Sequence, residues 1–361
     1  MLKIGGRQMT VPIIQGGMGI GVSLGGLAGA VAACGGMGVI SSANTGYAEP
    51  DFWQNHAEAN RRTLRAEILR ARQIAAGNGL VGVNIMVATR QYPEAVKTAV
   101  AAGADAIICG AGLPSDLPGL VSAASGEAEI LLAPIVSGGK AARTICRLWD
   151  RRYNVTPDFV VIEGAEAGGH LGFKRDELLN GTALPLMEIL VEVKTELAEY
   201  EQKYGREIPV FVAGGVYSGR DVAGYMQAGA AGAQIATRFI ATEECDAADG
   251  YKQAMLAAKA EDVRIVQSPV GMPGRALNSP LFKRLDAEGR IKPESCVNCI
   301  VPCRPAETPY CISRALIAAV QGDWENGLFF CGSNVGRLNK IVSVAELMAE
   351  IMDELVAENE V

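Results

Sequence analysis

Residues 209–237 read PVFVAGGVYSGRDVAGYMQAGAAGAQIAT, and this stretch indicates the fold. An apolar run at Pro209–Gly214 is followed by a helical pattern at Ser218–Ala228 and by a second apolar run at Gly232–Thr237. Ser218 is suited to cap the helix. Both runs are continuously apolar instead of alternating with polar residues, as expected for parallel strands that are buried on both faces. The stretch therefore predicts a strand–helix–strand unit.

The same alternation of apolar runs and helical patterns occupies most of the chain before this stretch. Six further apolar runs precede it: Pro12–Gly17, Gly38–Ser42, Val81–Met86, Ala106–Gly110, Ile130–Ser137 and Phe159–Glu163. Eight strand–helix units in about 250 residues are typical of a closed (β/α)8 barrel, or TIM barrel, rather than of an open doubly wound sheet. We therefore predict an α/β fold of this barrel type.

The pattern changes from about residue 264, where prolines become frequent. We expect a barrel over residues 1–263. Over residues 264–361 we expect a substrate-side loop, a cysteine-rich segment and two C-terminal helices that pack on the barrel. The first of these helices is predicted to begin at Thr308-Pro309, because Thr suits the N-cap and Pro the first helical position. The second is predicted to begin at Ser343, with Glu346 completing a capping box.

Composition and charge limit the classes of function. The chain carries 33 Lys and Arg against 40 Asp and Glu, a net charge of −7, which argues against a general nucleic-acid binder. The longest weakly polar region, Gly25–Ile40, is too short and too rich in glycine for a membrane span, so we expect no membrane partner. Residues 1–10 hold no apolar signal stretch, so we expect a cytoplasmic protein whose nine cysteines are reduced.

In barrels of this type the active site lies at the carboxyl ends of the strands, so these positions are the candidates for chemistry. The binding candidates there are Gly17, Met18 and Gly19, then Asn84, then Glu163, Gly168 and Gly169, then Gly214 and Gly215, and finally Gln234 and Thr237. The loops after strands seven and eight form the phosphate pocket of such barrels, so we expect a phosphate near Gly214, Gly215 and Thr237. An ordinary role of these glycines in tight turns is the alternative.

The chain has two histidines, His56 and His170. His56 lies in a polar helical stretch and is interpreted as a solvated surface residue. His170 follows two glycines at the predicted catalytic rim, which favours an acid–base or substrate-orienting role over that of a packed structural histidine. Glu163 and Glu166 are candidates for holding a cofactor or for tuning His170.

These motifs resemble the nitronate monooxygenase (2-nitropropane dioxygenase) family, which includes enoyl-acyl-carrier-protein reductase II and consists of FMN-binding TIM barrels. The resemblance covers about residues 1–280 and rests on five motifs in the family's order: Gln15–Gly19, Val83–Asn84, Glu163–Gly172, Ala213–Gly215 and Gly232–Phe239. It implies that His170 is the active-site histidine. It also implies FMN contacts at Gly17, Met18, Gly19, Asn84, Ser137, Glu163, Gly214, Gly215 and Thr237, to which we add Gly168, Gly169 and Gln234.

Within this family, two features favour the reductase branch. The monooxygenase branch often has lysine at the position of Ser137, whereas the nearest lysine that follows here is Lys140. Ser268–Arg275 also resembles the substrate-side segment of the reductase branch. The resemblance implies transfer of a hydride or of electrons through FMN to or from a small nitro or enoyl-thioester substrate, with NAD(P)H as co-substrate of a reductase. His170 would stabilise or protonate a developing anion, or act as a base toward a nitroalkane. A homodimer is the assembly we consider.

A cysteine cluster marks the second part of the chain. Cys296, Cys299, Cys303 and Cys311 lie within sixteen residues in a proline-bearing loop, and Cys331 is an alternative fourth ligand. Four thiols in such a loop can hold zinc or a [4Fe–4S] cluster, with iron–sulfur ahead of zinc. The C-x2-C-x3-C spacing also resembles the cluster-binding run of the iron–sulfur flavoenzymes related to 2,4-dienoyl-CoA reductase. A metal centre and a set of free thiols in a packed lobe both stay open.

Two other functions fit the same residues. A non-redox barrel isomerase or lyase would use the phosphate pocket for a phosphorylated substrate. A regulatory redox sensor would use the cysteine-rich lobe as its working part. A bound flavin separates the first of these from an FMN-dependent oxidoreductase, which is our leading interpretation.

Overall fold

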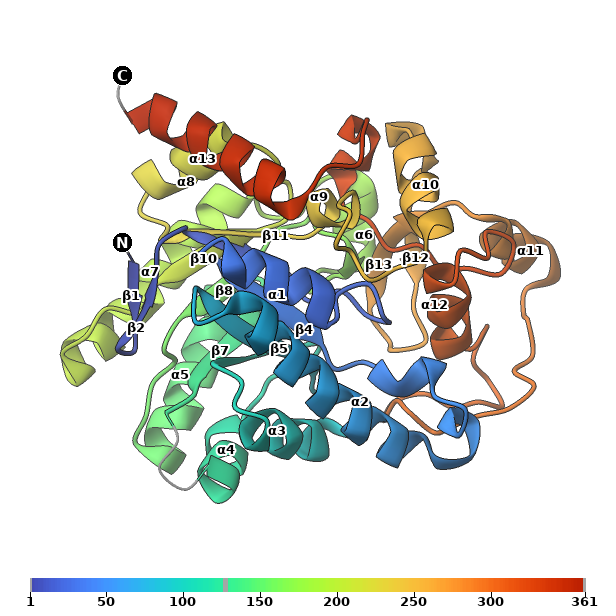
Figure 1. Cartoon of the computed structure of the whole chain (residues 1–361), viewed down its shortest axis with the longest axis horizontal. Coiled ribbons are helices and arrows are strands. Elements are labelled where there is room, and N and C mark those ends of the chain that lie inside the picture. Colours follow the sequence, from blue (N-terminus) through green and yellow to red (C-terminus); the bar gives the residue numbers. More distant parts are fainter. Residues whose placement is uncertain (1, 126–128, 360–361) are drawn as a thin grey trace.

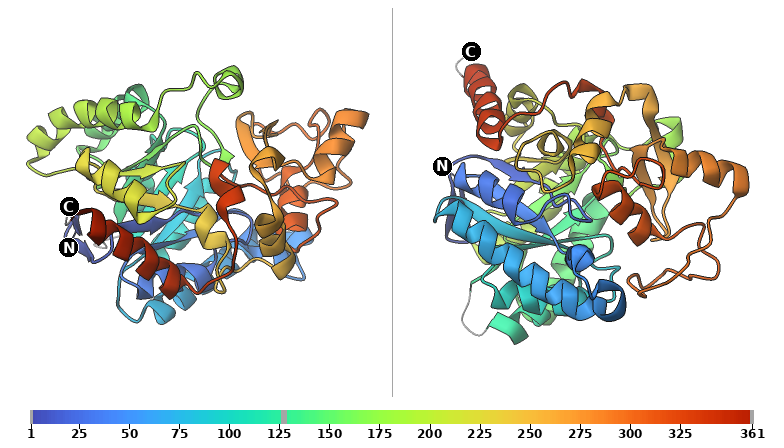
Figure 2. Two further views of the ribbon diagram at one scale, coloured as in Figure 1. Left: turned by 90° about the horizontal axis from the view of Figure 1, so that it is seen from above. Right: turned by 45° about the vertical axis from the view of Figure 1, so that its right-hand side comes forward.

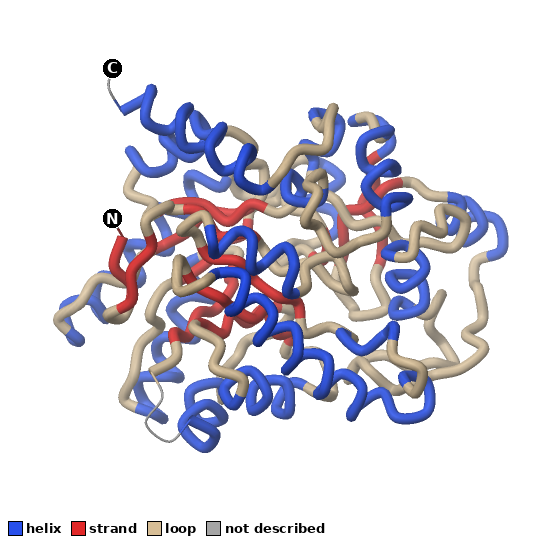
Figure 3. Tube along the Cα trace, in the orientation of Figure 1, coloured by secondary structure: helices blue, strands red, loops and turns tan. Residues whose placement is uncertain are grey.

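A closed barrel of parallel strands forms the centre of the protein (Figures 1 and 3). The computed structural model describes residues 2–125 and 129–359. Within them, the barrel strands are β3 (Ile13–Gln15), β4 (Met37–Ser41), β5 (Leu80–Met86), β6 (Ala106–Gly110), β7 (Leu131–Val136), β8 (Val160–Glu163), β10 (Val210–Ala213) and β11 (Gly232–Ile235). Pairing of β11 with β3 closes the barrel. The predicted (β/α)8 fold and all eight predicted strands are confirmed.

Helices cover the outside of the barrel and bury its apolar strands. They are α1 (Gly25–Ala33), α2 (Phe52–Ala75), α3 (Tyr92–Ala101), α4 (Leu117–Ser125), α5 (Gly139–Tyr153), α7 (Leu186–Tyr204) and α8 (Gly219–Gln227). The short α6 (Arg175–Asn180) has no buried residue and lies beside the strand at Val263–Gln267. The predicted cap of α8 is present, because Ser218 Oγ accepts a hydrogen bond from the Asp221 N–H at 3.2 Å. In return, the Asp221 carboxylate accepts one from the Ser218 N–H at 2.9 Å.

The chain ends close to where the barrel begins. Helix α13 (Val344–Asn359) packs between α8 and α1, and its Leu347 and Ile351 share a core with Leu27 of α1 (Figure 1). The helix that directly follows β11, α9 (Thr237–Ile240), has only four residues. Helix α13 therefore takes the place on the outside of the barrel, between α8 and α1, that a long helix after β11 would otherwise fill. The predicted cap of this helix is also confirmed, because Ser343 and Glu346 form the reciprocal hydrogen bonds of a capping box.

One end of the barrel is closed by the N-terminal hairpin of β1 (Leu2–Ile4) and β2 (Arg7–Met9). Ile4 and Met9 of this hairpin are buried in the barrel interior together with Phe159 and Phe211. The two phenyl rings meet edge to face, with centroids 5.7 Å apart. The interior is thus packed at this end, and open space is left to the opposite end, where the strands terminate.

A C-terminal lobe lies over that opposite end, on the right of Figure 1 and in both views of Figure 2. It holds α10 (Asp249–Ala257), η2 (Ala260–Asp262), β12 (Val263–Gln267), β13 (Pro273–Leu277), α11 (Pro280–Glu288), α12 (Ile312–Val320) and η3 (Ser333–Arg337). The short η1 (Thr45–Ala48) lies between β4 and α2 and packs against α2. Strand β13 pairs with β12 on one side and with the short β9 (Gly169–His170) on the other. This sheet ties the lobe to the loop that follows β8.

The predicted start of α12 is wrong. The helix begins at Ile312 with Cys311 as its N-cap residue, not at Thr308-Pro309. The Thr308 hydroxyl donates to the Tyr310 carbonyl at 3.0 Å, and the chain between Thr308 and Cys311 is not helical. The structure, over the residues it describes, contains no helix that is both long and apolar enough to span a bilayer.

Candidate active site

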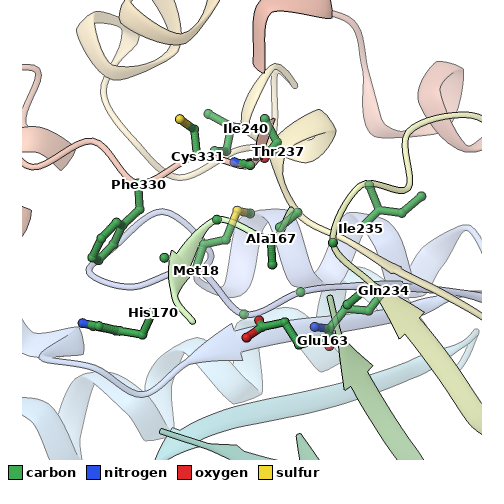
Figure 4. Close-up of a pocket in the computed structure, with 18 of the residues that line it drawn as sticks. Met18, Glu163, Ala167, His170, Gln234, Ile235, Thr237, Ile240, Phe330 and Cys331 are labelled. Atoms are coloured by element: carbon green, nitrogen blue, oxygen red, sulfur yellow. Dashed lines mark hydrogen bonds between the residues drawn. The ribbon is translucent and has the colours of Figure 1, made fainter. Parts of the chain in front are cut away.

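The main cavity lies where the barrel strands end and the C-terminal lobe begins. It has a volume of about 230 Å³. Its floor comes from the loops after the barrel strands, and its roof comes from Phe330–Asn334 and Tyr251 of the lobe. Figure 4 shows Glu163 and Gln234 side by side at the floor, with Phe330 and Cys331 on the other side of the space. Two parts of the chain that are distant in sequence therefore build one site.

Glycine shapes the floor by leaving out side chains. A Cβ on Gly17 would collide with Asn84, and a Cβ on Gly16 would lie 3.3 Å from Gln234. The backbone after β3 consequently lies close to two side-chain amides, each of which offers both donors and acceptors. Such a floor suits a flat group with polar atoms along its edge.

Two glycines with positive φ form the corner of the cavity after β10. Gly214 and Gly215 both have φ of +88°, a conformation that residues with a side chain rarely adopt. The lobe reaches this corner directly, since the Gly332 N–H donates to Thr237 Oγ1 at 2.9 Å. Asn334 Nδ2 also donates to the Gly215 carbonyl at 2.7 Å. The lobe therefore fixes both loops that were predicted to hold a phosphate.

His170 is held in the cavity wall by pairing with the lobe. It lies opposite Gly274 in the β9–β13 register, and its Nε2 is 2.7 Å from Ser268 Oγ. The edge of its ring meets Phe330, with ring centroids 5.1 Å apart. Burial lowers the pKa of His170 to about 4, because the charged imidazolium loses solvation. The imidazole is therefore uncharged at neutral pH.

Glu163 ends β8 and points into the same cavity (Figure 4). Burial raises the pKa of its carboxyl to about 8, because the carboxylate loses solvation. Glu166, by contrast, is exposed and accepts a hydrogen bond from Ser333 Oγ at 3.2 Å. Both glutamates proposed from the sequence therefore line the cavity, and Glu163 is the one in its floor.

Arg275 holds the loop between Glu163 and His170. Its Nη1 donates to the carbonyls of Ala165 and Ala167, the latter at 2.8 Å. Arg275 lies opposite Gly169 in β9, so the same strand that pairs with the His170 segment also fixes the turn before it. Charge-assisted bonds of this kind contribute about 1.5–3 kcal/mol each, so the loop is anchored rather than free.

The structure brings together all but one of the predicted site residues. The cavity is lined by His170 and by Gly17, Met18, Gly19, Asn84, Glu163, Gly168, Gly169, Gly214, Gly215, Gln234 and Thr237. Ser137 is not part of this lining, and its side chain lies against Gly172 instead. The backbone after β7 thus places Ser137 beside the loop that carries His170.

The cysteine cluster does not form a metal site in this structure. Cys296, Cys299, Cys303 and Cys311 surround a separate cavity of about 20 Å³. Over residues 2–125 and 129–359, no three or more Cys, His, Asp or Glu side chains converge as ligands for a metal ion. The Cys299 thiol is hydrogen-bonded to Ser313 Oγ at 3.0 Å, and Cys296 Sγ accepts from the Asn298 N–H.

Burial keeps two of these thiols protonated in the metal-free protein. It raises the pKa of Cys299 and of Cys303, which favours the thiol over the thiolate that binds metals. Cys331, the alternative ligand, lies in the main cavity, and burial raises the pKa of its thiol to about 12. The prediction of a zinc or iron–sulfur centre is therefore not supported, because spacing along the chain did not bring the sulfur atoms into a ligand set.

A sequence profile described as nitronate monooxygenase matches residues 2–354. The chain belongs to the nitronate monooxygenase family. The match extends well beyond residue 280, where the motif resemblance ended, so the lobe that roofs the cavity also belongs to the family pattern.

Curated relatives carry two kinds of name. A (3aS,4S,5R,7aS)-5-hydroxy-7a-methyl-1-oxo-octahydro-1H-indene-4-carboxyl-CoA dehydrogenase from Rhodococcus jostii is 26% identical over 281 residues, which cover 78% of this chain and 66% of that protein. A probable nitronate monooxygenase from Staphylococcus haemolyticus is 34% identical over 142 residues, covering 38% of this chain and 36% of that protein. The alignments thus span less than two thirds of the length of both relatives.

Solved structures share the fold over almost the whole chain. FabK from Thermotoga maritima aligns with a TM-score of 0.72 and 25% identity, covering 98% of this chain and 94% of that one. A nitroalkane oxidase from Streptomyces ansochromogenes aligns with a TM-score of 0.72 and 20% identity, covering 98% of each chain. These alignments support the barrel and the placement of the lobe over its mouth.

Several residues of the site were missed at the level of sequence. Ser268, Tyr251 and Phe330–Asn334 reach the cavity or His170 from the lobe, far along the chain. Their only signal was that Ser268–Arg275 resembled a substrate-side segment. Local motifs mark the glycine loops, whereas residues that arrive by folding of the lobe carry no comparable local pattern.

The pKa of Glu163 predicts how stability depends on pH. The carboxyl takes up its proton at about pH 8 in the folded protein but near 4.5 when unfolded. A raised folded-state pKa gives stability that is fully present below pH 4.5 and is lost as pH rises through 8. Glu163→Gln has no titrating carboxyl and removes this loss. At pH 9 the free energy of unfolding of the ligand-free variant should therefore exceed that of the wild type by on the order of a few kcal/mol, since each pKa unit corresponds to about 1.4 kcal/mol.

Urea unfolding at pH 5, 7 and 9 measures this difference. Glu207→Gln is the matched control, because Glu207 is exposed. The free energy of unfolding of this variant should equal that of the wild type at each pH. A Glu163→Gln variant that loses stability between pH 5 and pH 9 as steeply as the wild type would contradict the assignment.

Proposed function

We propose that the main cavity holds FMN and that the protein is an oxidoreductase, which transfers a hydride or electrons between FMN and a small substrate activated by a carbonyl or nitro group. One observation carries this proposal. An uncharged histidine, His170, stands in the wall of a cavity whose floor is glycine backbone flanked by the amides of Asn84 and Gln234. Membership of the nitronate monooxygenase family supports the same conclusion.

The residues present fit FMN. The missing side chain at Gly17 leaves room for a flat group, because a Cβ there would collide with Asn84. Gly214 and Gly215, both with positive φ, put no side chain between this corner and the cavity, so a phosphate would reach the backbone there. Thr237 adds a hydroxyl at the same corner. FMN bound here would supply the electron transfer that no protein side chain provides.

His170 is suited to act on a substrate oxygen. With a pKa of about 4 it is uncharged at neutral pH, and a neutral imidazole N–H donates a hydrogen bond to an oxygen on which negative charge develops. Ser268 Oγ accepts from the Val270 N–H at 3.2 Å and lies 2.7 Å from His170 Nε2. With the Ser268 O–H donating to Nε2, the single N–H of the neutral ring is on Nδ1 and is available to a substrate oxygen. Phe330 packs against the ring and excludes water from that side.

The names of the relatives support two substrate classes. One is an acyl-CoA thioester, as in the name of the Rhodococcus relative, and the other is a nitronate, as in that of the Staphylococcus relative. In the reductase reaction NAD(P)H would be the electron donor. Serine rather than lysine at position 137 favours the thioester class. A non-redox isomerase or lyase is less well supported, because neither relative bears such a name.

The proposal predicts a yellow protein that exchanges electrons with a thioester. We expect heat to release FMN from the purified protein, and NAD(P)H under anaerobic conditions to bleach its visible spectrum. Crotonyl-coenzyme A should then accept the electrons and restore the oxidised spectrum, whereas propionate 3-nitronate, an electron donor, should not. A protein that stays colourless after reconstitution with FMN would refute the proposal. Bleaching of the oxidised protein by propionate 3-nitronate, but not by NAD(P)H, would instead indicate the monooxygenase reaction.

His170 is predicted to lower the reaction barrier without holding the cofactor. His170→Ala removes one hydrogen-bond donor and should lower kcat about 10²–10³-fold while FMN content stays the same. His170→Asn keeps an uncharged donor and should recover part of the loss. His56→Asn, a change of the other histidine in helix α2, serves as the matched control and should leave kcat unchanged.

The pH profile gives a second readout of the same residue. Because the pKa of His170 is about 4, the pH profile of kcat/KM should show no inflection near pH 6.5 that is due to His170. The profiles of the wild type and of His170→Asn should therefore have the same shape around that pH. Such an inflection would show that His170 changes charge during the cycle and would contradict its role as a neutral donor.

A further inference from the structure

A second, smaller cavity adjoins the main one beside His170. Its volume is about 50 Å³, room for a few waters or for one small polar group. Ala43, Met86, His170 and Leu316 line both cavities, so single side chains form the boundary between them. A substrate that reaches His170 from the main cavity therefore has a neighbouring space to extend into.

Hydrogen bonds behind this cavity run in a defined direction. The Gly46 N–H donates to Asn60 Oδ1 at 2.9 Å, which fixes the orientation of the Asn60 amide. Asn60 Nδ2 then donates to Gln91 Oε1 at 2.8 Å and to Asn44 Oδ1 at 3.3 Å. Asn60 is only 5% exposed, so the protein rather than solvent sets this orientation.

In one branch of the network, the side chains of Asn44 and Ser313 form their hydrogen bonds with other protein groups. Asn44, whose oxygen faces Asn60, donates through Nδ2 to Ser313 Oγ at 3.0 Å. Ser313, 2% exposed, is in turn hydrogen-bonded to the Cys299 thiol at 3.0 Å. Asn44 and Ser313 therefore stiffen the cavity wall and leave little capacity for a ligand.

The other branch ends in an unused donor. Because Gln91 Oε1 faces Asn60, Gln91 Nε2 is the free end of the side chain. It is buried and has no hydrogen-bond partner in the part of the chain that the structure describes. Gln91 is among the residues that line the small cavity. An unsatisfied buried donor costs about 1–3 kcal/mol, a cost that an acceptor on a ligand would remove.

The charge of the wall limits which acceptor fits. The residues that line the small cavity, all of them within the described part of the chain, include no Lys, Arg, Asp or Glu. Moving an anion into such a space is unfavourable because nothing compensates its lost hydration. A carbonyl oxygen meets the Gln91 donor without that penalty, whereas a carboxylate or nitronate does not.

We propose that this cavity is a substrate subsite, in which Gln91 Nε2 donates a hydrogen bond to an uncharged carbonyl oxygen of a thioester, amide or ketone. Gln91 is then a specificity-determining residue, which selects neutral carbonyl substrates over anionic nitronates. The inference rests on the proposed function and narrows it, because it names the substrate class for the site beside His170.

Calorimetric titration of the oxidised protein as purified tests the subsite without turnover. The probes are the crotonyl thioester of N-acetylcysteamine, which is uncharged, and crotonate, which is its anionic counterpart. Wild type should bind the thioester at least tenfold more tightly than crotonate. Gln91→Glu keeps the acceptor for Asn60 but loses the free donor, so its Kd for the thioester should rise at least tenfold. Gln202→Glu makes the same exchange on the exposed face of α7 and should bind as wild type does.

Gln91→Met separates loss of the donor from addition of a charge. Its side chain is of similar length and uncharged but cannot donate, so it should weaken the thioester to a similar extent, with circular dichroism melts confirming the fold. Equal affinity of wild type, Gln91→Glu and Gln91→Met for the thioester would overturn the proposal, and so would tighter binding of crotonate by wild type.

Flavin content, measured in the same samples, distinguishes the two levels of inference. A yellow protein whose thioester affinity does not depend on Gln91 keeps the proposed function and loses the subsite. A colourless protein whose thioester affinity does depend on Gln91 keeps the subsite and loses the flavin.

Discussion

The antiparallel pairing of β13 with β9 is the interaction on which the site depends. It places His170 opposite Gly274, and the Leu171 N–H donates to the Pro273 carbonyl at 2.9 Å. Arg275, on the same strand, anchors the preceding turn through two carbonyls. A histidine that follows two glycines would otherwise have great conformational freedom. The barrel alone supplies a floor, and this pairing supplies a fixed wall and a roof.

Enclosure by the lobe also determines the electrostatics of the site. The same burial keeps His170 deprotonated and Glu163 protonated at neutral pH, so both groups are uncharged there. The cavity beside His170 likewise has a wall without charged residues, and its open donor is the amide of Gln91. The site therefore offers oriented dipoles rather than ions to a substrate. Dipoles of this kind stabilise charge that develops on a substrate oxygen without strongly binding an anion beforehand.

The barrel was predictable because parallel strands buried on both faces leave continuous apolar runs in the sequence. Ser218 and Ser343 were predictable as caps because their partners lie three residues away. Arg275, Ser268 and Phe330 were not, because they reach the site only through pairing across about a hundred residues or more. The metal site predicted from the cysteine spacing is not supported for a related reason, because spacing gives the distance along the chain but not the direction in which the thiols point. Helix α13, the last helix in the barrel shell, was likewise not assigned to that position from its sequence.

A crystal structure of the protein grown with FMN would show whether the barrel and the lobe together hold the cofactor. We expect the phosphate at Gly214, Gly215 and Thr237, and the ring system along Gly17 with His170 across the remaining space. We also expect the β9–β13 pairing to be intact in that complex. Density for FMN outside this cavity, or a His170 segment released from β13 when FMN is bound, would contradict this expectation.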